Sequence, residues 1–183
     1  GGQLLAAFFQ SATARTAGFN TIDIGQMVPA SLLFMMMLMF IGAGATSTGG
    51  GIKVTTFAVV LLATRAFLTK RPHVTAFGRT LSPQIVTRSL AIIIVSTMVL
   101  MLAMFLLMLT ESQSFDKIMF ETISAFATVG LSTGITASLS EPGKLILVLV
   151  MICGRLGPLT LAIMLARPVE TRIRYPEESV YTG

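Results

Sequence analysis

The stretch that decides the fold is Phe120-Glu121-Thr122-Ile123-Ser124-Ala125-Phe126-Ala127-Thr128-Val129-Gly130-Leu131-Ser132. It begins as an apolar segment too short to cross a membrane and ends in a Thr-Val-Gly turn, with long apolar segments on either side. A short helix here would point its negative C-terminal end at the turn. The backbone carbonyls of such a turn can replace the water around a cation. The stretch therefore predicts one wall of an ion pore, a pore helix followed by a filter turn.

Composition favours a membrane protein. Of the 183 residues, 54% are hydrophobic and 11% are charged, which is far too apolar for an ordinary soluble domain. The net charge of +5 comes from basic residues clustered between apolar runs, which membrane topology explains better than nucleic-acid binding. The single cysteine, Cys153, excludes an intrachain disulfide. The sequence offers no metal cluster and no Ser/His/Asp or Cys/His constellation, so we expect neither an enzyme nor an organic cofactor.

The other apolar segments predict an all-α membrane protein. Residues 27–41 and 52–62 read as one helix broken in the middle, because the first is shorter than the roughly 20 residues a span needs. Residues 89–109 form a complete span, and residues 145–166 form the last one. Residues 65–88 contain five basic residues, two prolines and no acid, which predicts a cytoplasmic loop by the positive-inside rule. The arginines after the last span place the C-terminus on the same side.

An internal repeat divides the chain. Gly18 aligns with Gly130, and the same offset aligns Gly42 with Gly154. Each copy therefore has a filter turn followed by an inner helix broken at the same distance. The expected units are a partial repeat at 1–66, a basic loop at 67–88, a complete repeat at 89–166 and a tail at 167–183. The first copy lacks an outer helix, and about four turns are needed to surround a cation, so we expect a fragment of a longer protein.

The two filter turns are the candidate ion-binding residues. Glycine at positions 18 and 130 allows positive φ angles, which lets successive carbonyls point the same way, toward the pore axis. The alternative is an ordinary helix C-cap glycine followed by an outer loop, but the second matched copy favours a pore. The positions whose carbonyls we expect to bind the cation are Thr16, Ala17, Gly18, Phe19, Asn20, Thr128, Val129, Gly130, Leu131 and Ser132.

The Gly-rich segment 42–51 lies inside the broken helix. It does not fit a phosphate loop, because Lys53 is displaced from the Gly-Lys-[Ser/Thr] order and no strand precedes it. A kink that improves packing and a non-helical plug under the filter are the two remaining interpretations. Ten small or hydroxylated residues exceed what a kink needs, which favours the plug. The expected gate residues are Gly42, Gly44, Thr46, Ser47, Thr48, Gly49, Gly50, Gly51, Lys53 and Arg155.

Three charged residues at membrane depth need a role. A charge within a span is costly and marks function, so we expect Arg155 to face the pore as an electrostatic barrier or as a tether for the Gly-rich segment. The alternative is an arginine paired inside the protein for packing. Lys53 either faces the inner pore or extends to the cytoplasmic boundary. Glu121 is expected to act as a brace in its pore helix rather than as an ion ligand.

Together these motifs resemble the Ktr/Trk/HKT potassium-transporter family. The matching segments are Thr-Ala-Gly-Phe-Asn at 16–20, Gly-Ala-Thr-Ser-Thr-Gly-Gly-Gly-Ile-Lys at 44–53, Ala-Thr-Val-Gly-Leu-Ser at 127–132 and Gly-Arg-Leu-Gly-Pro at 154–158. Members carry four repeats in one polypeptide around a single pore. The resemblance therefore implies that this chain is the third repeat without its outer helix plus the fourth, with the first two repeats missing. It also implies an intramembrane gating loop at 42–51 and an inner-pore arginine at Arg155.

The resemblance further implies the cargo and the partners. It implies the translocating subunit of a bacterial K⁺ uptake system in the inner membrane, with Na⁺ as a coupling or activating ion. Ktr-type members form homodimers in the lipid bilayer on a cytoplasmic ring of nucleotide-binding regulatory subunits, which the loop 65–88 and the C-terminal tail would approach. Two rival interpretations are a non-conducting scaffold and an ion-driven solute carrier. The carrier needs inverted repeats, whereas these copies run in the same direction.

Overall fold

We describe the protein from a computed structural model, which describes residues 2–42, 44, 49–157 and 160. Its helices are α1 (Gly2–Thr13), α2 (Pro29–Phe40), α3 (Val54–Leu68), α4 (Pro83–Thr110), α5 (Phe115–Ala127) and α6 (Glu141–Leu156). Short 3-10 turns, η1 (Ile24–Gln26) and η2 (Thr136–Ser138), precede α2 and α6. An antiparallel hairpin, β1 (Thr75–Ala76) and β2 (Arg79–Thr80), joins α3 to α4. The predicted all-α class is confirmed.

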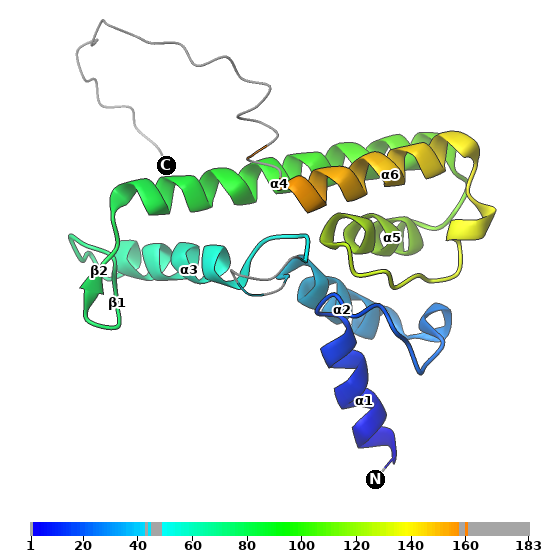
Figure 1. Cartoon of the computed structure of the whole chain (residues 1–183), viewed down its shortest axis with the longest axis horizontal. Coiled ribbons are helices and arrows are strands. Elements are labelled where there is room, and N and C mark those ends of the chain that lie inside the picture. The colour runs from blue at the N-terminus through cyan, green and yellow to red at the C-terminus, as the bar shows by residue number, and fades with distance from the viewer. Residues whose placement is uncertain (1, 43, 45–48, 158–159, 161–183) are drawn as a thin grey trace, which may run out of the picture.

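The helices form a bundle with α5 at its centre. In Figure 1, α4 and α6 run alongside one another, and α5 contacts both of them. On the other side of α5 lies α2, while α3 packs against α4. Helix α1 projects away from the bundle, and its side chains Leu4, Leu5 and Phe8 are between 71% and 80% exposed. The described structure therefore buries the second pore helix and leaves the first one uncovered.

One described helix, α4, is long and apolar enough to cross a membrane by its length and composition. Its 28 residues span about 42 Å at 1.5 Å per residue, which exceeds the roughly 30 Å hydrocarbon core. Helices α2 and α3 are each too short, with 12 and 15 residues. They are joined at the break, because Ile52 N–H donates to the Phe40 carbonyl at 3.3 Å and Gly42 N–H donates to the Ile52 carbonyl at 2.8 Å. The two ends of the Gly-rich segment therefore lie side by side, between the end of α2 and the start of α3.

The connection expected at 65–88 is shorter in the structure. Helix α3 continues past Arg65 to Leu68, and α4 already begins at Pro83. Arg65 lies in the last turn of α3, where the negative end of the helix dipole favours a cation. Pro83 starts α4 because a proline in the first turn loses no intrahelical hydrogen bond. The basic residues and prolines, which suggested a loop, are partly helix ends.

The last span, expected at 145–166, begins four residues earlier in the structure, and of its residues after Gly157 the structure describes only Thr160. Helix α6 begins at Glu141, where the Ser140 hydroxyl accepts a hydrogen bond from Gly143 N–H and caps the helix. It ends at Leu156, before Gly157 with a φ of +85°. The tail expected at 167–183 lies outside the described residues.

Two apolar clusters surround α5. The first joins α5 to α2 and to both filter turns, and it contains Ala14, Ile24, Leu32, Met35, Met36, Met39, Phe120, Ala127, Val129 and Leu131. The second joins α5 to α4 and α6, and it contains Leu100, Ala103, Leu107, Ile118, Ala125, Phe126, Ile135, Leu139, Leu147 and Val150. Phe120 in the first cluster and Phe126 in the second are both fully buried. The packing therefore fixes the position of α5 and of the turn that follows it.

Candidate ion pore

The two predicted filter turns share one backbone pattern. The φ angle is +76° at Thr16 and at Gly18 in the first turn. It is +54° at Thr128 and +89° at Gly130 in the second. Positive φ is uncommon for a residue other than glycine, and it is unfavourable for a β-branched residue such as threonine. Strained positions of this kind persist only where their surroundings hold them, and they concentrate at functional sites.

The turns lie against one another at their glycines. A Cβ added to Gly18 would come within 2.5 Å of the Val129 carbonyl oxygen. A Cβ added to Gly130 would lie 3.7 Å from the Gly18 Cα. A side chain at position 18 would therefore strike the backbone of the second turn, in addition to requiring a positive φ. The two filter turns, the candidate pore walls, are therefore in close backbone contact.

A hydroxyl group from each pore helix holds the following filter turn. Thr13 Oγ1 donates to the Phe19 carbonyl at 2.5 Å, and it also accepts from Phe19 N–H at 3.0 Å. Ser124 Oγ donates to the Leu131 carbonyl at 2.6 Å. Phe19 and Leu131 occupy equivalent positions in the repeat, so the arrangement occurs twice. Both residues are among the expected ion ligands, and in the structure their carbonyl oxygens accept hydrogen bonds from the pore helices.

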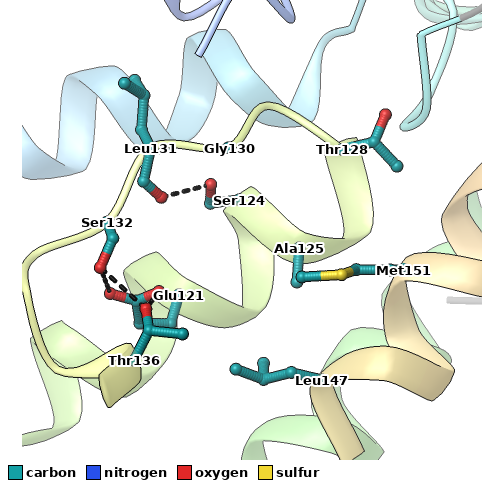
Figure 2. A pocket seen from close by; sticks show the side chains of 10 residues that line it. All are labelled: Glu121, Ser124, Ala125, Thr128, Gly130, Leu131, Ser132, Thr136, Leu147 and Met151. Carbon is teal, nitrogen blue, oxygen red and sulfur yellow. Dashed lines mark hydrogen bonds between the residues drawn. The ribbon is translucent and has the colours of Figure 1, made fainter. Parts of the chain in front are cut away.

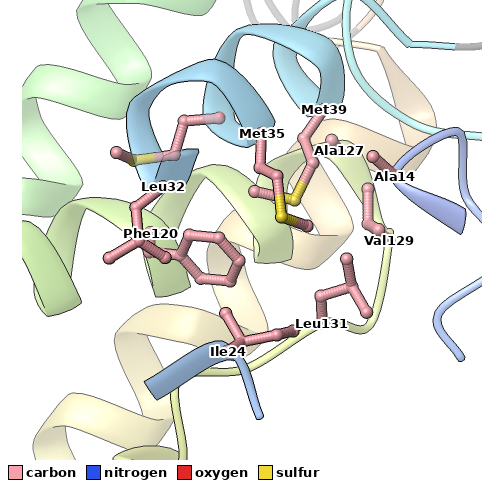
Figure 3. Packing of buried hydrophobic residues seen from close by; sticks show 10 residues of the cluster. Ala14, Ile24, Leu32, Met35, Met39, Phe120, Ala127, Val129 and Leu131 are labelled. Atoms are coloured by element: carbon pink, nitrogen blue, oxygen red, sulfur yellow. The ribbon is translucent and has the colours of Figure 1, made fainter. Parts of the chain in front are cut away.

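The side chains of the other filter residues are either packed in the core or exposed. Val129 and Leu131 point their side chains into the first apolar cluster, against α2 and α5 (Figure 3). Ala17 is exposed, and Asn20 donates through Nδ2 to the Ile22 carbonyl at 3.3 Å. Packing therefore anchors the second turn from behind by its side chains. The backbone of this turn can therefore line the pore on the side away from the cluster.

The described end of the Gly-rich segment, residues 49–51, lies against both filter turns. Gly50 N–H donates to Thr128 Oγ1 at 2.8 Å. A Cβ added to Gly50 would lie 2.9 Å from the Phe126 carbonyl oxygen, and one added to Gly49 would lie 2.8 Å from Thr16 Cγ2. Only glycine allows such close approach, so the composition of this segment matches its place beneath the turns.

The other expected gate residues are distributed around the same point. Gly51 has a φ of +75°, and Gly44 has no atom within 4 Å of a built Cβ. Lys53 Nζ donates to the Gly49 carbonyl at 2.5 Å, so the ammonium group reaches back to the Gly-rich segment. Neither predicted alternative for Lys53, facing the inner pore or extending to the boundary, included this contact. Thr46, Ser47 and Thr48 lie outside the described residues.

Arg155 lies in the last turn of α6, close to the Gly-rich segment. It lines a cavity of about 380 Å³ together with Gly49, Lys53 and Gly154. The sequence predicted Arg155 beside a break near the centre of the last span, and in the structure it lies at the C-terminal end of α6, where the helix dipole favours a cation. Gly154, expected at the helix break, lies inside α6. A Cβ there would overlap the Phe126 carbonyl oxygen, so this glycine serves close helix packing.

Glu121 is buried and fastened to the residues that follow the second filter turn. Its Oε1 accepts from Ser132 Oγ at 2.6 Å and from Thr133 N–H at 2.9 Å. The Thr133 hydroxyl also donates to Oε1, at 3.1 Å, and Thr136 Oγ1 donates to Oε2 at 2.9 Å. Figure 2 shows the carboxylate between α5 and the non-helical segment 129–135, which we call the filter strand. The expected brace therefore acts on the filter strand as well as on the pore helix, and the sequence carried no signal for these partners.

Comparison with known proteins decides the family. Residues 1–173 match the model of the TrkH family, described as cation transport protein. The chain belongs to the TrkH family of cation transport proteins. The resemblance inferred from the filter and loop motifs is thereby confirmed. So is the expectation of a membrane transport protein rather than an enzyme.

Two of the named relatives of this TrkH-family chain are bacterial potassium uptake proteins. The chain is 66% identical over 183 residues to Ktr system potassium uptake protein B of Vibrio alginolyticus, covering all of this chain and 40% of the relative. It is 43% identical over 181 residues to the protein of the same name in Bacillus subtilis (strain 168), covering 99% of this chain and 41% of the relative. The chain thus spans about two fifths of the length of these curated relatives.

A solved structure shares the TrkH-family fold. The potassium transporter TrkH from Vibrio parahaemolyticus superposes with a TM-score of 0.72 at 24% identity, over 88% of this chain and 36% of that chain. At this identity the likeness establishes the fold alone. It agrees with the helical bundle described above and with an all-α membrane protein.

Proposed function

We propose that this chain forms two of the four walls of a K⁺ uptake pore. The observation that carries the proposal is the pair of adjacent filter turns, each following a short helix and each with positive φ at matched positions. The names of the two Ktr relatives, both potassium uptake proteins, point to K⁺ as the cargo. The other two walls come from repeats that this chain does not contain.

In the proposed mechanism, K⁺ exchanges water for backbone carbonyls of the two turns. The ligands that we assign are the carbonyls of Thr16, Ala17, Gly18, Thr128, Val129 and Gly130. We leave out those of Phe19 and Leu131, because each is directed at a pore-helix hydroxyl, from which it accepts a hydrogen bond. Asn20 and Ser132 follow at the outer edge. The C-terminal ends of α1 and α5 add the negative end of each helix dipole to the site.

We assign the gate to the Gly-rich segment 42–51. Its contacts with Thr16 and Thr128 support a barrier directly below the filter. Lys53 anchors the segment through the Gly49 carbonyl, and Arg155 lines the cavity beside it. Opening requires that Gly50 separate from Thr128, after which an ion can reach the cytoplasmic side.

The assembly follows from the family resemblance and from charge. Residues 65–88 contain five lysines and arginines, so the positive-inside rule supports a cytoplasmic connection between α3 and α4, and with it a cytoplasmic C-terminus. We propose a homodimer in the bacterial inner membrane, bound to a cytoplasmic nucleotide-binding ring. Na⁺ coupling or activation is proposed on the resemblance alone.

The test is tracer competition in cells that lack other K⁺ uptake and express the full-length protein. We expect ⁸⁶Rb⁺ uptake that unlabelled K⁺ suppresses at much lower concentration than Na⁺ does. Equal suppression by the two ions would exclude a K⁺-selective filter. Absence of uptake by protein that is inserted in the membrane would favour a scaffold.

A further inference from the structure

We propose that Glu121 sets the K⁺/Na⁺ selectivity of this pore by holding the outer part of the second filter turn against α5. The proposal rests on the proposed function and goes beyond it. It assigns to a residue outside the ion pathway the task of keeping the carbonyls of the turn at the spacing that K⁺ requires. Glu121 is thus a positioning residue that acts through its neighbours.

Two attachments on one face of α5 hold the strand that leaves the filter. Glu121 and Ser124 are three residues apart, so both side chains project from the same side of the helix (Figure 2). Ser124 holds the Leu131 carbonyl, immediately after the filter glycine Gly130. Glu121 holds Ser132, Thr133 and Thr136 one helical turn further out. The strand is therefore fixed from the glycine outward, and Glu121 makes most of these contacts.

The burial and charge of Glu121 make this attachment strong. The residue is 5% exposed, and its two carboxylate oxygens accept four hydrogen bonds. Hydrogen bonds to a carboxylate are roughly twice as strong as neutral ones. The ion pair observed among the described residues joins Lys144 to Glu141 and does not involve Glu121. Hydroxyl and backbone amide donors therefore stabilise the Glu121 carboxylate there. A buried negative charge behind the filter also favours a cation in front of it, because the dielectric constant is low.

In the part of the chain that the structure describes, no carboxylate holds the first filter turn in this way. The offset that aligns Gly18 with Gly130 places Phe9 opposite Glu121, and Phe9 is 40% exposed. The first turn keeps the hydroxyl attachment through Thr13, but the carboxylate that follows it in sequence, Asp23, accepts from Gly25 N–H in η1. The two walls therefore differ in how firmly they are held. Selectivity that depends on Glu121 belongs to the second wall.

The experiment compares Glu121→Gln and Glu121→Leu in the full-length transporter. The readout is the ratio of Rb⁺ to Na⁺ uptake at matched membrane abundance, which a loss of folded protein alone does not change. Leucine removes every acceptor, and we expect the ratio to fall by roughly tenfold or more, as the loss of hydrogen bonds to a charged group implies. Glutamine keeps one acceptor oxygen and the shape, so we expect a smaller fall.

The matched control is Glu111→Gln. Glu111 is a half-buried carboxylate that accepts from Ser140 N–H and Ser140 Oγ at the start of α6, away from the filter strand. We expect this variant to lower abundance and to keep the wild-type ratio.

Wild-type ratios in both Glu121 variants, with a lowered ratio in Gly130→Ser, would overturn the Glu121 proposal and leave the pore intact. Should Glu121→Leu fail to reach the membrane, a wild-type ratio in Glu121→Gln, a variant without the charge, still overturns it. Unchanged ratios in all three would reject the proposed function itself.

Discussion

The Gly50 N–H donates to Thr128 Oγ1 at 2.8 Å, joining the Gly-rich segment to the second filter turn across 78 positions of sequence. Thr128 is also a strained residue, with a φ of +54°. Movement of Gly50 away from the turn removes a hydrogen bond from Thr128. The proposed gate and the proposed filter are therefore in direct contact, and neither can move without affecting the other.

Thr128→Val should release the segment, because valine keeps the shape of threonine but cannot accept the Gly50 N–H. An unpaired donor costs about 1–3 kcal/mol, which shifts a closed–open equilibrium by roughly fivefold or more. We expect faster Rb⁺ uptake at saturating Rb⁺. Thr128→Ser keeps the hydroxyl and serves as the control. Equal uptake rates in the two variants would show that the hydrogen bond does not hold the gate.

Lys53→Met should loosen the same segment from its other end. The variant keeps the length of the side chain and removes the ammonium group that donates to the Gly49 carbonyl. A hydrogen bond from a charged group contributes about 1.5–3 kcal/mol, so we expect a higher uptake rate with unchanged K⁺/Na⁺ preference. Lys53→Arg, which retains the charge, should stay closer to wild type. A change in ion preference without a change in rate would contradict the anchor role.

Gly154→Ala should destabilise the contact between α5 and α6. The added Cβ would overlap the Phe126 carbonyl oxygen, and overpacking of this kind costs about 1–3 kcal/mol. We expect a lower thermal unfolding temperature of the purified full-length protein and less of it in the membrane. Gly44→Ala is the comparison, because a Cβ there meets no atom within 4 Å in the described structure. Equal unfolding temperatures would mean that the helices can separate without cost.

The helices and the break at the Gly-rich segment could be predicted because their signals are local. Apolar length located α4, expected at 89–109 and observed at Pro83–Thr110, and glycine content marked the segment between α2 and α3. Bounds that depend on helix ends were less accurate. Arg65 shows why: the positive-inside rule gives the side of the membrane on which a residue lies, but it does not say whether that residue is helical.

The site's hydrogen bonds could not be predicted from sequence. Nothing in the pattern around Phe19 or Leu131 indicates that their carbonyls turn back toward Thr13 and Ser124. The partners of Glu121 likewise depend on how the strand after the filter returns along α5. Such contacts are set by tertiary structure. The repeat offset located the two turns and not the orientation of each peptide group within them.

The measurement that tests the pore most directly compares Gly130→Ser with Gly134→Ser in the full-length protein. Both glycines have positive φ, +89° and +92°, so a side chain strains the backbone similarly at each position. Only Gly130 lies against the other filter turn, since a Cβ at Gly134 meets no atom within 4 Å. At matched membrane abundance, we expect Gly130→Ser to lose its preference for Rb⁺ over Na⁺ and Gly134→Ser to keep it. Equal ion preference in the two variants would contradict the assignment of residues 128–130 to the filter.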